Sequence, residues 1–243
     1  MKNKLIILAL TLLYTTVNAQ NNYFELYTDS TALKIQNDAL ILDFEIQIKR
    51  FEPSFSFNGL TTEIPNNFMP GQYTSKTNKI YLNTWQVGGP PMESFLTEIT
   101  GSKESGQQAG ALFFYGFFLP HEIGHGLHFQ TDNVPKNNYD SEYEANEIAV
   151  SYWRSKGKQK ELQQCYVLAK KILSQLKNPI PENTDEKEYI TAHYKELMND
   201  PYKYGYIQFS QIVKILEDKS LPKFEKYIKK YFKNKSNKKK NGR

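Results

Sequence analysis

The sequence predicts an α+β protein with a small strand-containing N-terminal lobe and a helical C-terminal lobe. Two observations carry this prediction. Apolar and polar residues alternate strictly over residues 42–49, which is typical of a half-buried strand. Beyond residue 108, apolar residues recur at helical spacing in one segment after another. Because no linker separates the two parts cleanly, we expect a single domain over residues 20–233, with its N-terminal lobe ending near residue 130.

The individual elements follow from local patterns. Leu33 and Ile35 are expected to form a hairpin partner for the 42–49 strand, with a turn at Asn37 and Asp38. Residues 53–78 hold the prolines and glycines of a loop, and residues 79–83 are expected to form a short strand. Helices are expected over residues 92–99, 109–129 (with an interruption at Pro120), 141–155, 158–176, 186–198, 206–216 and 221–232.

Residues 1–19 have the composition of a secretory signal peptide. Lys2 and Lys4 precede an apolar run over residues 5–14, and Ala19 provides the small residue of a cleavage site. The run is shorter than the roughly 20 apolar residues that a transmembrane helix needs. No cysteine follows it that could carry a lipid anchor. We therefore expect a secreted or periplasmic protein, with a buried N-terminal helix as the alternative interpretation.

Cysteine content and charge narrow the class of protein. The single cysteine, Cys165, excludes a disulfide scaffold and a cysteine-built metal site. The net charge of +5 comes from the two ends of the chain, since residues 219–243 hold eleven basic residues and one acid. We expect no nucleic-acid partner, because the chain is expected to be exported and its sequence contains no recognisable nucleic-acid-binding motif. Residues 221–232 are expected to form a helix that packs on the rest of the domain, and residues 234–243 to form a disordered basic tail. The alternative is that this C-terminal segment binds an anionic surface.

The segment over residues 119–128 carries the chemistry. His121, Glu122 and His125 form the pattern HExxH on an expected helix. Residues four apart lie on one helical face, so both imidazoles can reach one Zn²⁺. Glu122 lies beside the first of them and can accept a proton from a water activated by the metal. The alternative is a buried helix with incidental polar residues, which would leave these side chains without polar partners.

A third ligand is expected on the next helix. Glu142 is the preferred candidate, because Ser141 and Glu144 fit a capping box that gives Glu144 a structural role. Asn146 lies four residues after Glu142 and can hold the second ring nitrogen of a ligating histidine. Glu144 remains an alternative ligand, and the weaker candidates are His128, Asp140, Glu147 and His193.

These residues resemble the gluzincin zinc metallopeptidases. The resemblance rests on the sequence HEIGH at residues 121–125, followed by EYEAN at residues 142–146. The second of these local sequences is especially similar to that of the ImmA/IrrE-like and HtpX-like branches. It implies a zincin-like fold, bound Zn²⁺ and hydrolysis of peptide or protein substrates. It also implies that His121, His125 and Glu142 are ligands, that Glu122 is the general base, and that Asn146 supports a ligand. Residues 79–83 would be the edge strand along which a substrate lies.

Stabilisation of the oxyanion needs a further donor. His193 is the preferred candidate for this donor, and the tyrosines at positions 189, 194, 204 and 206 are alternative candidates. A rival hypothesis is an inactive zincin-like surface binding protein that keeps the fold without turnover. A second rival is a structural surface protein in which the tail is the functional part. The sequence does not predict the cleavage specificity or the oligomeric state.

Overall fold

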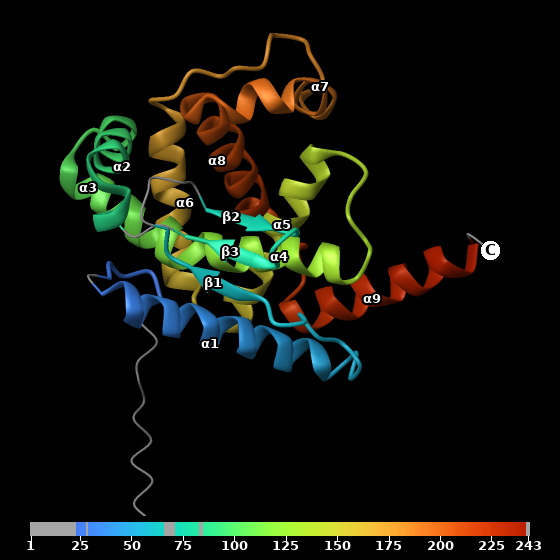
Figure 1. Cartoon of the computed structure of the whole chain (residues 1–243). Helices are drawn as coiled ribbons and strands as arrows, with labels where there is room; N and C mark the ends of the chain where they lie inside the picture. Colours follow the sequence, from blue (N-terminus) through green and yellow to red (C-terminus); the bar gives the residue numbers. More distant parts are fainter. Residues whose placement is uncertain (1–22, 28, 66–70, 83–84, 242–243) are drawn as a thin grey trace, which may run out of the picture.

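The described part of the chain is an α+β structure that is mostly helical and contains one small sheet (Figure 1). The computed structural model describes residues 23–27, 29–65, 71–82 and 85–241. In chain order the described elements are α1 (Ser30–Lys49), β1 (Thr61–Glu63), β2 (Gln72–Thr74), β3 (Lys79–Tyr81), α2 (Trp85–Thr100), α3 (Lys103–Ala109), the π-helix η1 (Gly110–Phe117), α4 (Phe118–Gln130), α5 (Asn138–Ser155), α6 (Gln159–Leu173), α7 (Glu186–Met198), α8 (Pro201–Glu217) and α9 (Phe224–Asn241).

Helix α1 replaces the hairpin that the sequence predicts. The prediction of a strand over residues 42–49 with a partner at Leu33 and Ile35 is wrong, and Asn37 and Asp38 lie inside the helix rather than in a turn. Asp29 caps the helix, because its Oδ1 accepts hydrogen bonds from the backbone N–H groups of residues 31 and 32. The buried residues recur at the helical spacing of three and four, which is decisive over a 20-residue segment. They are Leu33, Asn37, Leu40, Ile41, Phe44 and Ile48.

The sheet has the strand order β1-β3-β2. Strand β1 pairs parallel to β3, and β2 pairs antiparallel to it. The strand predicted at residues 79–83 is therefore confirmed for Lys79–Tyr81, but it is the central strand, so the expectation that it forms the sheet edge is wrong. Asn83 lies outside the described residues. Strands β1 and β2 both arise from residues 53–78, which we expected to be loop, because three-residue strands are too short to show a pattern of alternation.

The C-terminal helices agree with the prediction apart from their ends. Helix α7 has the predicted bounds, and α6 and α8 differ from theirs at the termini. Helix α5 begins earlier than expected: Asn137 is its N-cap, and its side chain accepts from the backbone N–H of Asp140. The predicted capping box of Ser141 and Glu144 is therefore wrong. Helix α5 is central in the fold, because it packs against α4, α6, α7, α8 and α9.

A π-helix leads into α4. The N–H of Phe118 bonds to the carbonyl of Phe113, five residues back, which is the wide spacing of a π turn. Pro120 follows at the third position of α4 and cannot donate to the carbonyl of Gly116. The indole Nε1 of Trp153 on α5 donates to that carbonyl instead, at 3.2 Å. The carbonyl of Gly116 thus keeps a hydrogen-bond donor, although Pro120 cannot supply the usual backbone one.

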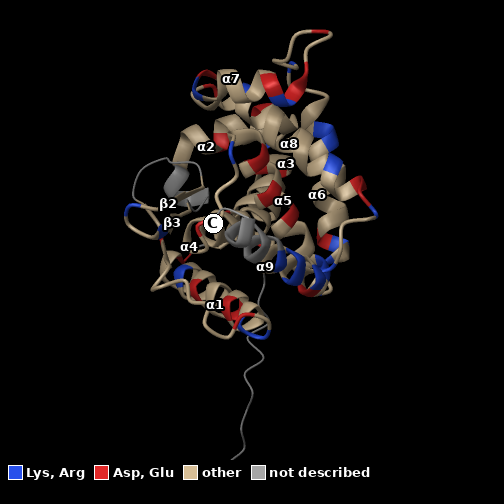
Figure 2. Cartoon of the chain, turned by 90° about the vertical axis from the view of Figure 1, so that its right-hand side faces the viewer, with Lys and Arg blue, Asp and Glu red and all other residues tan. Residues whose placement is uncertain are grey.

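Helix α9 covers the end of the α1–α5 contact. Phe224 packs edge-on against Phe44 of α1, and both rings contact Tyr152 of α5. The helix continues to Asn241, beyond the predicted end at residue 232. Lysines gather on α9, whereas acids and bases are mixed on α1 (Figure 2). Among the described residues, no helix combines the length and hydrophobicity needed to cross a bilayer. The predicted signal peptide lies outside the described residues.

Candidate metal centre

His121 and His125 lie on the same face of α4 and meet Glu142 of α5. Their Nε2 atoms are 3.1 Å apart. The Oε2 atom of Glu142 lies 3.3 Å from the Nε2 of His121 and 3.7 Å from that of His125. The three ligand atoms are all within 4.8 Å of one another, and the side chains of His121 and Glu142 are buried. The three residues that the sequence nominates as metal ligands are therefore brought together.

Gly124 and Ala145 set the distance between the two helices. Gly124 lies between the two histidines in the chain, and Ala145 lies between Glu142 and Asn146. A Cβ atom at position 124 would be 3.2 Å from the Cα of Ala145 and 3.4 Å from its Cβ. The small residues of both motifs thus let α4 and α5 approach closely enough for their polar side chains to meet.

The buried carboxylate of Glu142 is held by neutral donors from two other helices. The hydroxyl of Tyr194 on α7 donates to Oε1 at 2.7 Å, while Gln208 and Tyr204 on α8 donate to Oε2 at 2.7 and 3.3 Å. Burial alone would raise the pKa of Glu142, yet His125 and His121 hold it well below its usual value. Burial and the same carboxylate raise the pKa of Tyr194 and Tyr204. Glu142 is therefore negatively charged, and both tyrosines keep their protons.

Asn146 fixes the orientation of His121. Its Nδ2 donates to the side-chain oxygens of Gln208 and Gln211, at 3.3 and 3.2 Å, so its Oδ1 is the atom that faces His121. The 2.8 Å contact between this Oδ1 and the Nδ1 of His121 then requires the proton to be on Nδ1. The Nε2 of His121 is left with its lone pair directed at the cluster, as a metal ligand needs.

The imidazole of His125 is also in contact with a polar group on α5. Its Nδ1 lies 3.5 Å from the hydroxyl of Ser141. Burial alone would lower the pKa of His125, but the carboxylates of Glu142 and Glu122 raise it above its usual value. Ser141, which the sequence assigns to a helix cap, thus lies next to the cluster instead.

Glu122 lies beside the cluster without joining it. Its Oε2 accepts a hydrogen bond from the backbone N–H of Tyr73 at 2.6 Å, and its Oε1 is 3.9 Å from the Nε2 of His121. Tyr73 belongs to β2, which lies at one edge of the sheet. The N–H group that orients Glu122 therefore comes from an edge strand, and no side-chain pattern in the sequence could have indicated it.

A cavity of about 280 Å³ opens beside the cluster. Its polar wall is formed by His121, Glu122, Tyr204 and Gln208. Gly71 closes one side, where a Cβ atom would be only 3.1 Å from the Cδ2 of Leu82. The rest of the lining is mainly apolar and includes Met92, Phe95, Leu96, Phe114, Phe118, Met198 and Phe209.

The other ligand candidates have partners away from the cluster. Glu144 faces His128, with 3.5 Å between its Oε2 and the histidine Nε2. His128 is buried and stacks on Tyr231 of α9. Glu147 accepts a hydrogen bond from Tyr227, and Asp140 forms an ion pair with Lys187. Among the described residues, the metal-ligating groups that converge are His121, His125 and Glu142.

The candidates for a further catalytic donor are divided between two places. His193 is 46% exposed on α7, where it contacts Tyr189 and lies 3.8 Å from Glu196; its catalytic role stays a prediction. Tyr194, the next residue, points to Glu142, and Tyr204 reaches both Glu142 and the cavity. The sequence interpretation missed Gln208 and Gln211, whose signal is two glutamines within an otherwise apolar helical stretch.

Comparison of the chain with known protein families, with characterised proteins and with solved structures gives no match. The assignment of a function therefore depends on the geometry of the cluster and on the local motifs that form it.

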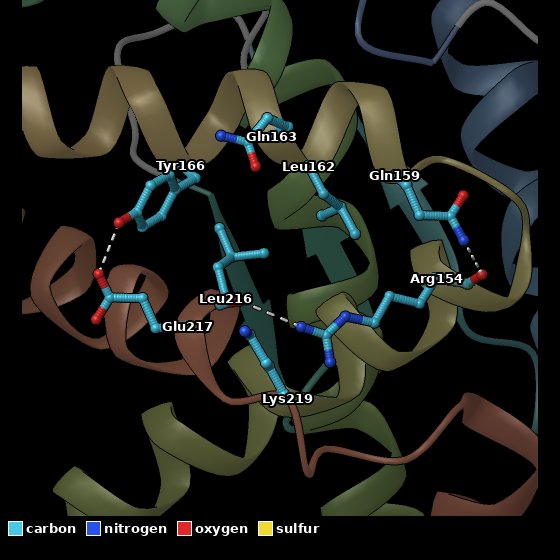
Figure 3. Close-up of a pocket in the computed structure, with 8 residues that line it drawn as sticks. All are labelled: Arg154, Gln159, Leu162, Gln163, Tyr166, Leu216, Glu217 and Lys219. Atoms are coloured by element: carbon cyan, nitrogen blue, oxygen red, sulfur yellow. Dashed lines mark hydrogen bonds between the residues drawn. The ribbon is translucent and has the colours of Figure 1, made fainter.

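A second cavity, of about 320 Å³, lies between α6 and the end of α8 (Figure 3). The guanidinium of Arg154 donates to the backbone carbonyls of Leu216, Asp218 and Leu221. The hydroxyl of Tyr166 donates to Glu217 at 2.7 Å. Arg154 is thus bound to the backbone and Glu217 to Tyr166, so these two charged groups do not converge on a common point as the cluster residues do.

Proposed function

We propose that the protein is a zinc-dependent peptidase of the gluzincin type. The observation that carries the proposal is the convergence of two imidazoles and a buried carboxylate, with Glu122 held directly beside them. Nitrogen and oxygen donors in this combination suit Zn²⁺, whereas Mg²⁺ and Ca²⁺ prefer sites built from oxygen alone. His121, His125 and Glu142 would hold the ion. Bound there, it would supply Lewis acidity toward a peptide carbonyl and would lower the pKa of water.

Glu122 acts as the general base in this proposal. Its carboxylate lies next to the cluster and is oriented by the Tyr73 N–H, so it can take a proton from the attacking water and pass it to the leaving amine. The hydroxyl of Tyr204 lines the same cavity and stays protonated; its proton, which is donated to Glu142 in the structure, would turn to the oxyanion when a substrate binds. Tyr204 is thus better placed for this role than the exposed His193.

The cavity and the sheet edge suggest how a peptide would bind. The apolar walls would accept a hydrophobic side chain next to the bond that is cleaved. Strand β2, rather than the central β3, lies at the edge of the sheet. Because its Tyr73 N–H is already bound to Glu122, an extended substrate would pair with other backbone groups of this edge. A zincin-like fold and action outside the cytoplasm remain part of the proposal, the latter on the strength of residues 1–19.

The test combines metal analysis with cleavage of a random peptide library. Purified protein should contain one equivalent of zinc and cleave peptides. Glu122→Gln should keep the zinc and lose turnover by about a thousandfold. The amide can neither take the proton from the attacking water nor pass it to the leaving amine. Glu144→Gln, a change of the same type on a residue paired with His128, should behave as wild type. Zinc-loaded protein that cleaves no peptide would favour a binding protein, and absence of zinc would contradict the metal site itself.

A further inference from the structure

Helix α1 carries a second apolar face, opposite to the one that packs in the core. The exposed fractions of Ile35, Leu42 and Ile46 are 66%, 59% and 48%. Ala32 and Ala39 are exposed as well, so apolar residues lie at 32, 35, 39, 42 and 46, with alternating steps of three and four. This spacing forms a straight stripe along a helix. We call these five residues the α1 stripe.

The stripe stands out from the rest of the surface. Of the nine exposed large hydrophobic side chains among the described residues, three lie on it, and the other six are distributed over the rest of the chain: Leu26, Phe129, Val134, Val167, Met198 and Tyr202. Helix α1 lies along one edge of the molecule, with β1 and α9 against its inner side (Figure 1). Among the described residues, the outer face of α1 is therefore open from Ala32 to Ile46, a rise of about 21 Å along the helix.

We propose that the α1 stripe pairs with the same stripe of a second copy of the chain, with the two helices antiparallel about Ala39. An antiparallel pair related by a two-fold axis at this residue brings residue i opposite residue 78 − i, as a closed symmetric dimer requires. Ala39 then meets its own counterpart. Ala32 of one copy faces Ile46 of the other, and Ile35 of one copy lies within one residue of the level of Leu42 of the other, so the stripe residues of the two copies meet along the whole length.

Charge favours the same arrangement. The N-cap Asp29 is exposed, and Lys49 and Arg50 are exposed at the other end of the helix. In the antiparallel pair, Asp29 of one copy faces Lys49 of the other at both ends, and the two helix dipoles oppose each other. A parallel pair would place like charges together.

The flanks of the stripe argue against a membrane as its partner. They carry ion pairs of mixed sign, between Lys34 and Asp38 and between Lys49 and Glu45. Figure 2 shows the same mixture of acids and bases on α1. Alternating charges beside an apolar stripe are typical of helices that pair, whereas a helix that binds anionic lipid has a basic polar face.

The experiment is sedimentation equilibrium of the zinc-loaded or metal-free full chain over a wide concentration range. Wild-type protein should be in a monomer–dimer equilibrium. Leu42→Lys should raise the dissociation constant at least tenfold, because two leucines lose their buried contact in each dimer. Val167→Lys is the matched control, since Val167 is also 59% exposed on a helix, and it should leave the constant unchanged.

Cross-linking tests the geometry. Ala39→Cys should form a disulfide-linked dimer under mild oxidation, because the two-fold axis passes beside this residue and the native Cys165 is buried. Val167→Cys should not. A wild-type protein that stays monomeric, a dimer that Leu42→Lys leaves intact, or a dimer that Ala39→Cys does not trap would each overturn the proposal. So would a monomer whose Leu42 is needed for binding to phosphatidylglycerol vesicles. None of these outcomes depends on the proposed peptidase activity.

Discussion

The cavity beside His121 and the cavity around Arg154 have similar volumes, about 280 and 320 Å³, but their polar groups are directed differently. Around Arg154, the guanidinium is occupied by the carbonyls at the end of α8 and in the loop after it (Figure 3). Beside His121, two ring nitrogens and a carboxylate oxygen converge at one point. Two neutral tyrosines and a glutamine hold that carboxylate without neutralising its charge. The convergence of donors, rather than the size of the cavity, therefore distinguishes the candidate site.

Among substitutions at the cluster, Glu142→Gln is expected to have the largest effect on zinc affinity. The amide keeps the shape of the side chain but removes the negative charge that zinc requires, so affinity for zinc should fall by more than about a hundredfold. Competition with a chromophoric chelator measures the affinity. Glu144→Gln is the control and should bind zinc normally; equal loss in both variants would mean that charge on α5 matters generally and that the cluster is not the site.

Removal of the support behind His121 should have a smaller effect. Asn146→Ala takes away the acceptor that keeps the proton on Nδ1, and zinc affinity should fall by roughly 10–100-fold. The same chelator titration applies. Asn146→Asp retains an acceptor at the same place and should bind zinc more tightly than Asn146→Ala. If the alanine variant keeps full affinity, the orientation of His121 does not depend on Asn146.

The spacing of the helices is tested by Gly124→Ala. The added methyl group would contact the backbone of Ala145, so α4 and α5 must move apart and zinc affinity should fall by about tenfold or less. At Gly126, a Cβ would instead meet the tip of Leu60, which can move. Gly126→Ala should therefore leave the affinity unchanged. Isothermal titration of both variants decides whether interhelical distance controls the site.

Substitutions in the second cavity should leave zinc affinity unchanged. Arg154→Met removes the donor to several backbone carbonyls and should lower the free energy of unfolding by about 2 kcal/mol. Lys219→Met, in the same cavity, should change it by less than about 0.5 kcal/mol, because that lysine is exposed. Urea unfolding measures both. A loss of zinc in Arg154→Met would remove the distinction between the two cavities.

The sequence predicted the parts of the site that are local. His121, His125 and Glu142 could be nominated because helical geometry fixes which residues share a face, and the motifs on α4 and α5 are short. The glutamines of α8, Gln208 and Gln211, could not, because a glutamine in an amphipathic helix is equally compatible with solvent until the neighbouring helices are known. The N–H of Tyr73 depends on strand order, which a three-residue strand does not encode.

Helix α1 shows why the largest error occurred. Leu42 and Ile46 lie on the outer stripe, while Phe44 and Ile48 face the core. Two apolar faces on opposite sides of one helix make apolar residues alternate along the chain, which imitates a strand over eight residues. Only the longer series of buried positions, from Leu33 to Ile48, distinguishes a helix. The same two-faced pattern that misleads the prediction is what exposes the stripe.

The hydrogen bond from Trp153 to the carbonyl of Gly116 gives the protein an internal optical probe. Trp153 is 1% exposed, and its indole lies where α5 holds the turn that leads into α4. Any loosening of these two helices would bring water to the indole and shift its emission to longer wavelength. Because Pro120 removes the backbone donor to this carbonyl, fluorescence from Trp153, measured in a Trp85→Phe variant, reports on the packing that positions the histidines without a label near them.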